Sequence, residues 1–322
     1  MEPQFAKVFG NYAYVPSSTT ANSGRETSGN SSYTGVDDTF ALRNAYMDLS
    51  VHENLNIIAG RQALSYGDQY IVGVSDWGVY GRTFDAVRLR STFGKSWVDV
   101  FQAKLVENTA SSSNKGDDKD FAGLYMSFVP ADSIKALDLY GFYLSDNQKS
   151  TANNNTVDTS RPWHFGVYGT RFVTEFGALG WKFEYAKNFG SENTTSMGEN
   201  KENDMIDTQV DFKFGETAKH KVGLQFMMAG QNWRELYGTT TTPFGRTDVL
   251  GRRNITGLGL HWNAVWSDMW TTDVDAYVFQ RTKDETTVFG TDSSTTLVTL
   301  PAAGSTEKSV GSNVDLIAKY AM

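Results

Sequence analysis

The sequence has no cysteine, only four histidines and six prolines, and no run of eighteen or more apolar residues. Without cysteine the chain forms no disulfide, thiolate nucleophile or cysteine-ligated metal site. The lack of long apolar runs excludes transmembrane helices. The 37 acidic residues exceed the 29 basic ones, which argues against nucleic acid as a partner. The chain is instead rich in aromatic residues, with 20 Phe, 15 Tyr and 8 Trp, and these residues favour strands.

Apolar and polar residues alternate with a period of two in many segments, most clearly in 206–214 and 222–228. Successive strand side chains point to opposite faces, so each of these segments has one apolar and one charged face. The polar break 215–220 between them is a short turn. An apolar face toward lipid and a polar face toward an interior are typical of a transmembrane β-barrel.

We predict an all-β fold: a single antiparallel up-and-down transmembrane barrel, residues 1–322, of about fourteen strands, with sixteen or twelve as alternatives. The strands are expected near 4–15, 39–51, 55–64, 84–93, 96–106, 120–129, 136–145, 161–170, 177–187, 203–214, 220–229, 255–266, 271–282 and 309–322.

Short and long connections alternate along the chain. The short ones fall at 52–54, 94–95, 130–135, 173–176, 215–219 and 267–270, and the long polar ones at 16–38, 65–83, 107–119, 146–160, 188–202, 230–254 and 283–308. Outer-membrane barrels have short periplasmic turns and long extracellular loops. We therefore expect the bacterial outer membrane, with lipid and lipopolysaccharide as partners. A soluble β-sandwich is the alternative, but it requires no such regular alternation.

Two further features of the sequence bear on orientation and targeting. Trp266 and Trp270 flank one short connection and Trp97 follows another, where a periplasmic aromatic girdle is expected. The start, Met1-Glu-Pro-Gln-Phe5, lacks the charged and apolar regions of a signal peptide, so we expect a mature chain.

Charged residues opposite the apolar face are predicted to line the barrel interior, because charge against hydrocarbon is unfavourable. The predicted lining residues are Arg43, Arg61, Arg88, Arg90, Lys104, Lys182, Glu184, Asp207, Gln209, Asp211, Lys213, Lys221, Gln225, Asp273, Asp275, Arg281, Asp315 and Lys319. In one interpretation, Arg61, Arg88 and Arg90 form a cationic ladder that selects solutes by charge. In the other, the same residues form interior ion pairs that hold the barrel in shape.

The densest motif runs through Gly60-Arg-Gln, Tyr66-Gly-Asp68, Asp76-Trp77 and Gly81-Arg-Thr-Phe-Asp85, followed by Arg88. This order resembles the signature of the alginate-export family of outer-membrane β-barrels, over about residues 41–101. The resemblance implies passive passage of anionic polysaccharide or small hydrophilic solutes, and it adds Arg82 and Asp85 to the pore-lining residues. It also makes Asp68, Asp76 and Trp77 pore-loop candidates. A packed loop against the barrel wall is the alternative for Asp76, Trp77, Arg82 and Asp85.

These observations predict an outer-membrane porin for small hydrophilic, charged solutes. A structural or surface-binding barrel with a blocked lumen and an exporter of anionic polysaccharide are the alternatives.

The four histidines have no partner pattern for catalysis or metal binding, so we expect no enzyme, catalytic residue, metal or cofactor. We expect a monomer rather than a trimer. The 230–254 loop, with Trp233 and Tyr237, is expected to face solvent, although it could also fold inward as a constriction.

Overall fold

The structure is a computed structural model that describes residues 2–6, 39–75, 81–106, 119–146, 162–192, 195–196, 203–216, 219–239, 250–283, 287–289, 296–299 and 308–321. These residues form strands, turns and extended segments. None of them belongs to a helix long and apolar enough to cross a membrane.

The described residues contain seventeen strands. They are β1 (Glu2–Ala6), β2 (Thr39–His52), β3 (Leu55–Gln62), β4 (Phe84–Phe93), β5 (Ser96–Val106), β6 (Lys119–Phe128), β7 (Ile134–Asp146), β8 (Pro162–Phe176), β9 (Leu179–Glu192), β10 (Thr195–Ser196), β11 (Asp204–Phe214), β12 (Lys219–Ala229), β13 (Ile255–Val265), β14 (Trp270–Arg281), β15 (Thr287–Phe289), β16 (Thr296–Thr299) and β17 (Ser309–Tyr320).

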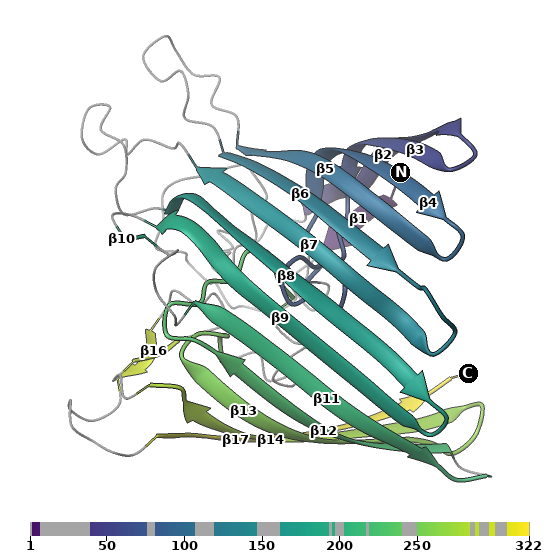
Figure 1. The fold of residues 1–322 in the computed structure, drawn as a ribbon, viewed down its shortest axis with the longest axis vertical. Coiled ribbons are helices and arrows are strands. Elements are labelled where there is room, and N and C mark those ends of the chain that lie inside the picture. Colours follow the sequence, from purple (N-terminus) through teal and green to yellow (C-terminus); the bar gives the residue numbers. More distant parts are fainter. Residues whose placement is uncertain are drawn as a thin grey trace.

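All but β15 and β16 belong to one 15-stranded antiparallel sheet, in which each strand pairs with the next along the chain. The short strand β10 lies off this path and pairs only with β9, so fourteen strands form the continuous ladder. The sheet bends into a deep trough with one convex and one concave face (Figure 1). Within the described residues, β1 and β17 form the two ends of the ladder and do not pair with each other.

The predicted up-and-down strand order and the predicted strand number are confirmed, and most boundaries agree to within a few residues. One predicted connection, 173–176, is wrong. Strand β8 continues to Phe176, and the turn falls at Gly177 and Ala178 instead. Gly177 has a φ of 58°, a left-handed conformation that glycine adopts without a steric penalty. The hairpin β15–β16 and the short strand β10 lie in predicted long loops and were not expected.

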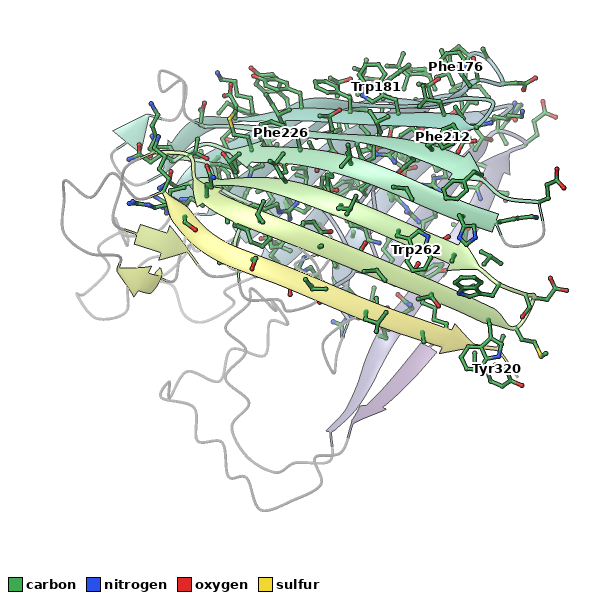
Figure 2. The ribbon with its side chains drawn as sticks, turned by 90° about the horizontal axis from the view of Figure 1, so that it is seen from below. Phe176, Trp181, Phe212, Phe226, Trp262 and Tyr320 are labelled. Carbon is green, nitrogen blue, oxygen red and sulfur yellow. The ribbon has the colours of Figure 1, made fainter. Side chains whose placement is uncertain are left out.

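The convex face is apolar, and aromatic residues gather on it near the short turns. Figure 2 shows Phe176, Trp181, Phe212, Trp262 and Tyr320 at this end of the strands. Trp266 and Trp270, predicted for this girdle, are about half exposed there, at 47% each. Trp97 is not part of it. Its ring packs on the concave side, 4.5 Å from the Arg90 guanidinium carbon, because odd-numbered β5 residues point inward.

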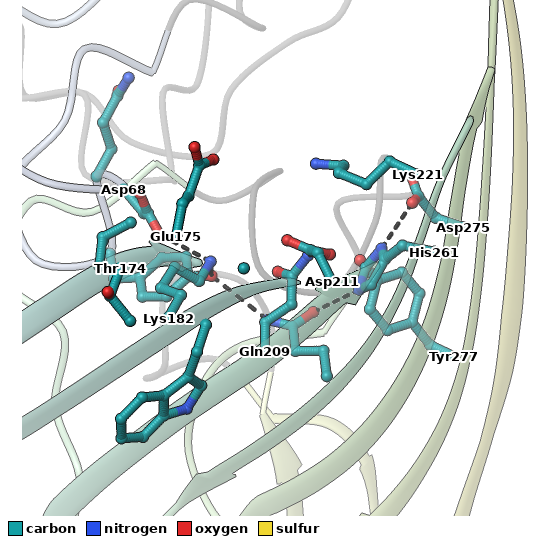
Figure 3. A pocket seen from close by; sticks show the side chains of 16 residues that line it. Asp68, Thr174, Glu175, Lys182, Gln209, Asp211, Lys221, His261, Asp275 and Tyr277 are labelled. Atoms are coloured by element: carbon teal, nitrogen blue, oxygen red, sulfur yellow. Dashed lines mark hydrogen bonds and ion pairs between the residues drawn. The ribbon is translucent and has the colours of Figure 1, made fainter. Parts of the chain in front are cut away.

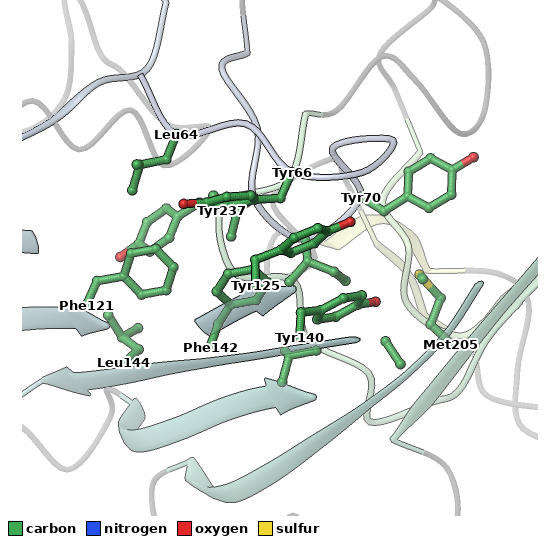
Figure 4. Packing of buried hydrophobic residues seen from close by; sticks show 14 of the residues in the cluster. Leu64, Tyr66, Tyr70, Phe121, Tyr125, Tyr140, Phe142, Leu144, Met205 and Tyr237 are labelled. Atoms are coloured by element: carbon green, nitrogen blue, oxygen red, sulfur yellow. The ribbon is translucent and has the colours of Figure 1, made fainter. Parts of the chain in front are cut away.

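A second apolar region lies on the concave face. Inward residues of β5, β6 and β7 form an aromatic layer that includes Phe101, Phe121, Tyr125, Tyr140 and Phe142. Segment 63–75, which follows β3, covers this layer (Figure 4). Its Tyr66 ring stacks on Tyr125, with 4.8 Å between centroids. Both faces of the sheet are therefore apolar over these strands, and a connecting segment rather than lipid covers the inner one.

The direction of each side chain predicts how much a charge at that position lowers the free energy of unfolding in the membrane. Leu260 lies in the middle of β13, on the convex face, and is half exposed. We expect Leu260→Arg to destabilise the membrane-inserted protein by about 2–4 kcal/mol, because the charge would meet hydrocarbon. Met269→Arg, in the short turn after β13, should cost no more than about 1 kcal/mol. Urea unfolding from lipid vesicles measures both, and equal effects would contradict the assigned faces.

Candidate functional site

Two connecting segments fold onto the concave face and pair with each other. We name residues 63–75 the first inward segment and residues 230–239 the second inward segment. Val72 and Tyr237 form a parallel bridge. The Tyr237 amide donates to the Ile71 carbonyl at 2.9 Å, and the Gly73 amide donates to the Tyr237 carbonyl at 2.8 Å. The two segments, far apart in sequence, thus form one unit inside the trough.

Arg82 holds this unit together. Its buried guanidinium donates to the carbonyl oxygens of Gly73, Tyr237 and Gly238, so it ties both inward segments to the start of β4. Predicted as a pore-lining residue, Arg82 instead has the role of the packed-loop alternative. The expectation that the 230–254 loop faces solvent is wrong for its described part, since Trp233 and Tyr237 are buried.

The second inward segment is held by Arg252, in the stretch before β13, and by Asn188 of β9. Arg252 donates from Nε and Nη2 to the Glu235 carboxylate, both at 3.0 Å, and both side chains are almost fully buried. The Asn188 side chain of β9 donates to the Arg234 carbonyl at 2.9 Å and accepts from the Arg234 amide at 2.8 Å. These contacts satisfy the Glu235 carboxylate and both polar groups of the Asn188 side chain, so they hold the second inward segment in place.

Asp68 fastens the first inward segment to the strands. Its carboxylate lies 2.7 Å from Arg171 of β8 and 2.8 Å from Lys182 of β9. Burial alone would raise the pKa of the Asp68 carboxyl, but the charges of Lys182 and Arg171 outweigh it, so the pKa lies below its ordinary value. Arg171 also lies 3.0 Å from the Asp138 carboxylate of β7. Asp68, a predicted pore-loop residue, thus anchors the first inward segment to β8 and β9.

The inward-pointing part of the predicted cationic ladder shares one buried carboxylate. Arg90 makes two hydrogen bonds of 2.6 Å to the Asp99 carboxylate. Arg88 lies 3.6 Å from the same carboxylate, and the Tyr66 hydroxyl donates to it at 3.2 Å. Asp99 is fully buried. Arg88 and Arg90 therefore act as interior ion-pair partners of Asp99, whose single charge balances one of their two.

Arg61, Asp85 and Lys104, predicted to face the lumen, lie on the convex face instead. They occupy directly opposed positions on β3, β4 and β5, and Lys104 opposes Asp120 of β6. Arg61 pairs with Asp85 at 2.7 Å and Lys104 with Asp120 at 3.2 Å. The same side of β4 carries Val87 and Leu89, both exposed to the surroundings of the sheet.

This outward row lies at the strand ends next to the long connections, beyond the apolar band. Charge is inexpensive at that depth, because side chains reach the headgroup region there. Arg43 has the same strand parity as the outward-facing Met47 and Leu49 of β2, so it too belongs to the convex side. The rule that charges point inward therefore fails near the strand ends.

The other predicted residues lie on the concave face of β9, β11, β12, β14 and β17. Glu184 accepts a 2.7 Å hydrogen bond from the Tyr140 hydroxyl, and Asp207 accepts one of 2.5 Å from Gln225. Further pairs join Lys213 to Glu175 at 2.7 Å and Lys319 to Asp273 at 3.0 Å. Arg281 is buried near the far end of β14. Asp76 and Trp77, both pore-loop candidates, lie outside the described residues.

A cavity of about 480 Å³ lies between the first inward segment and strands β8 to β14. Figure 3 shows Glu175, Asp211 and Lys221 reaching into it from different strands. At its far wall, His261 is held between two partners: Nδ1 lies 2.7 Å from Asp275 and Nε2 lies 2.9 Å from Gln225. Among the described residues, no group of three or more acidic or histidine side chains is arranged to hold a metal ion.

Several residues of this face escaped the sequence analysis. Asp99, Asp138, Arg171, Glu175 and His261 all lie inward and take part in its ion pairs or hydrogen bonds. The alternation on β13 could have predicted that His261 points inward, because the apolar Leu258, Leu260 and Trp262 occupy even-numbered positions and His261 an odd-numbered one. On β5 and β7 the inward residues are largely apolar, so their few acidic residues gave no clear polar face.

We expect Asp68→Asn to destabilise the protein by about 3–5 kcal/mol at neutral pH, because Arg171 and Lys182 would lose a buried counter-charge. In the wild type, a folded pKa below the unfolded one means that the unfolded chain binds more protons in the acid range. The contribution of Asp68 is therefore complete above the unfolded pKa and lost as the pH falls through the folded pKa. The variant should lack this part of the acid dependence.

Denaturant unfolding over a pH series measures both effects. Asp132→Asn is the matched control, since the Lys95–Asp132 pair of a short turn has side chains 73% and 99% exposed, and such pairs contribute little. If the two variants behave alike, Asp68 does not anchor the first inward segment.

Comparison with known proteins places the chain in a family. The family model described as "Alginate export" matches residues 18–322. Among solved structures, the chain is similar to OmpT of Vibrio cholerae, an outer-membrane protein, at 12% identity and a TM-score of 0.47, covering 87% of this chain and 81% of that one. A loop-deletion mutant of OmpT gives 14% identity, a TM-score of 0.44, and coverage of 88% and 80%. No curated protein matches. Because the family model spans nearly all of its length, the chain belongs to the alginate-export family and is an outer-membrane protein with a role in transport.

Proposed function

We propose that the protein is a channel through which small hydrophilic, charged solutes diffuse passively across the outer membrane. The observation that carries this proposal is the polar cavity between the first inward segment and β8 to β14. The inward segments fill the side of the trough next to β5, β6 and β7, whereas this side keeps open volume with charged walls. A narrow polar path of this kind suits small solutes rather than a polymer.

The charge of the open wall favours cations. One cross-strand row on the concave face runs through Glu175, Gly180, Asp211, Gly223, His261, Asp275 and Asp315, each directly opposite the next. It contains four carboxylates and no lysine or arginine. The arginines of β4 and β8 are paired with buried carboxylates on the other side of the trough. A wall with this sign attracts cations and repels anions.

Two other functions fit the geometry less well. An anionic polysaccharide would pass an acidic wall, while the cations that were expected to guide it are paired or face outward. A structural barrel with a blocked lumen is favoured by one observation, the pairing of the two inward segments across the trough. Under that alternative the protein would carry no current, which separates it from a channel.

Planar-bilayer recording of the purified, folded protein tests the channel directly. We expect ion conductance, with a reversal potential in a salt gradient that indicates cation preference. The double variant Asp211→Asn and Asp275→Asn should shift that potential toward anions, because it removes two of the four carboxylates in the row. Absence of conductance from folded protein would overturn the channel and support the blocked barrel.

Arg61→Gln serves as the control for this measurement. Arg61 pairs with Asp85 on the convex face, so neutralising it should leave the reversal potential unchanged. A shift as large as that of the double variant would mean that Arg61 faces the conducting path.

A further inference from the structure

The cavity beside the first inward segment contains charges of both signs that the protein itself does not neutralise. Asp211 accepts a 2.8 Å hydrogen bond from Gln209 but has no cationic partner among the described residues. Asp275 has only the Nδ1 contact of His261. Lys221 makes no hydrogen bond or ion pair with any residue that the structure describes, and its ammonium group reaches into the open space (Figure 3).

The other charges around the cavity are already engaged. Lys182 lies 2.8 Å from Asp68 and 3.7 Å from Asp207, and Glu175 lies 2.7 Å from Lys213. Both ring nitrogens of His261 have partners, so the ring orients Asp275 rather than offering a free ligand atom. Two carboxylates and one ammonium group therefore remain for a solute.

The spacing of these three groups sets the size of that solute. Asp211 and Asp275 lie in the same cross-strand row on β11 and β14, three strand spacings apart, or about 14 Å between backbones. Both side chains point into the trough, which shortens the distance between their carboxylates. Lys221 lies on the intervening strand β12, two residues from Gly223 in the row.

Gly223 keeps the floor between the two carboxylates open. A Cβ atom built at this position would lie 2.1 Å from the Asp211 Oδ1 atom, so any side chain would displace the carboxylate. With glycine there, a solute can lie across β12 and reach both acidic groups. The cavity volume of about 480 Å³ accommodates a molecule of amino-acid size.

We propose that this cavity is a binding subsite for basic amino acids, in which Lys221 binds the carboxylate and Asp211 and Asp275 bind the two cationic groups. This inference rests on the proposed channel function and names a solute class for it. Two cationic groups and one carboxylate match the three free charges in number and sign. Anionic amino acids have one cationic group, so they leave one carboxylate of the subsite unpaired and place a second carboxylate of their own beside it, which is unfavourable in a confined polar site.

Single-channel recording with added L-arginine, agmatine or L-glutamate tests the subsite. Agmatine has both cationic groups of arginine but lacks its carboxylate. We expect L-arginine to interrupt the potassium chloride current in a saturable way, agmatine to bind at least about tenfold more weakly, and L-glutamate to have no effect. Lys221→Gln should reduce the affinity for arginine to that for agmatine, with little effect on agmatine itself.

Asp211→Asn and Asp275→Asn should each weaken arginine binding at least about tenfold. Asp132→Asn, in an exposed short turn, is the control and should bind as the wild type does. Circular dichroism of each variant confirms that it is folded, and tryptophan fluorescence titration with arginine gives a second measure of binding. A protein that conducts potassium chloride but shows no arginine dependence overturns the subsite alone. Equal affinities for arginine and agmatine overturn the role of Lys221, and absence of all conductance overturns the channel.

Discussion

In hydrocarbon no water is available to satisfy backbone N–H and C=O groups, so every strand that crosses the membrane must bond to a neighbouring strand. The ladder from β1 to β17 satisfies those groups by pairing each strand with the next along the chain. Such pairing forces side chains to alternate between lipid and interior. The apolar residues of the convex face, the charged residues of the concave face and the aromatic girdle at the short turns follow from it.

On the concave face, the two sides of the trough have different contents. Next to β5, β6 and β7, the inward segments cover an aromatic layer, and buried carboxylates pair with Arg88, Arg90 and Arg171. Next to β11, β12, β13 and β14, the buried inward residues Met205, Met227, Ile255 and Phe279 lie toward the ends with the long connections, and charged side chains line open volume beyond them. Packing and open volume thus share one face of the sheet. Asp68 joins them, because it lies in the packed segment and pairs with Lys182 at the cavity.

The strand order and most strand boundaries could be predicted from alternation, because one face of each strand meets lipid over most of its length. The faces of Arg61, Asp85 and Lys104 could not. In β3, Ile57 and Ile58 are both apolar, and in β4 the inward Phe84 and Ala86 are as apolar as the outward Val87. The inward segment packs on that inner face, so the polar half of the pattern disappears where these residues lie.

The depth of each residue in the membrane was the second quantity that the alternation does not give. Alternation predicts which of two faces a residue takes, but a charge on the outer face is unfavourable only within the hydrocarbon. The row from Arg61 to Asp120 lies beyond it, so charge alone was a poor guide there. On β11, by contrast, Ile206, Val210 and Phe212 mark the lipid face clearly, and the inward positions of Asp207, Asp211 and Lys213 follow.

The period of two, the alternation of short and long connections and the family signature are all readable in the order of the residues, since these features depend on neighbours along the chain. Three further features depend on the three-dimensional arrangement: the pairing of residues 63–75 with 230–239 inside the trough, the contacts of Asp99 with Arg88 and Arg90, and the position of Asp211, Asp275 and Lys221 around one cavity. Those contacts join positions many strands apart. Register and curvature bring them together, and neither is encoded in any short stretch of residues.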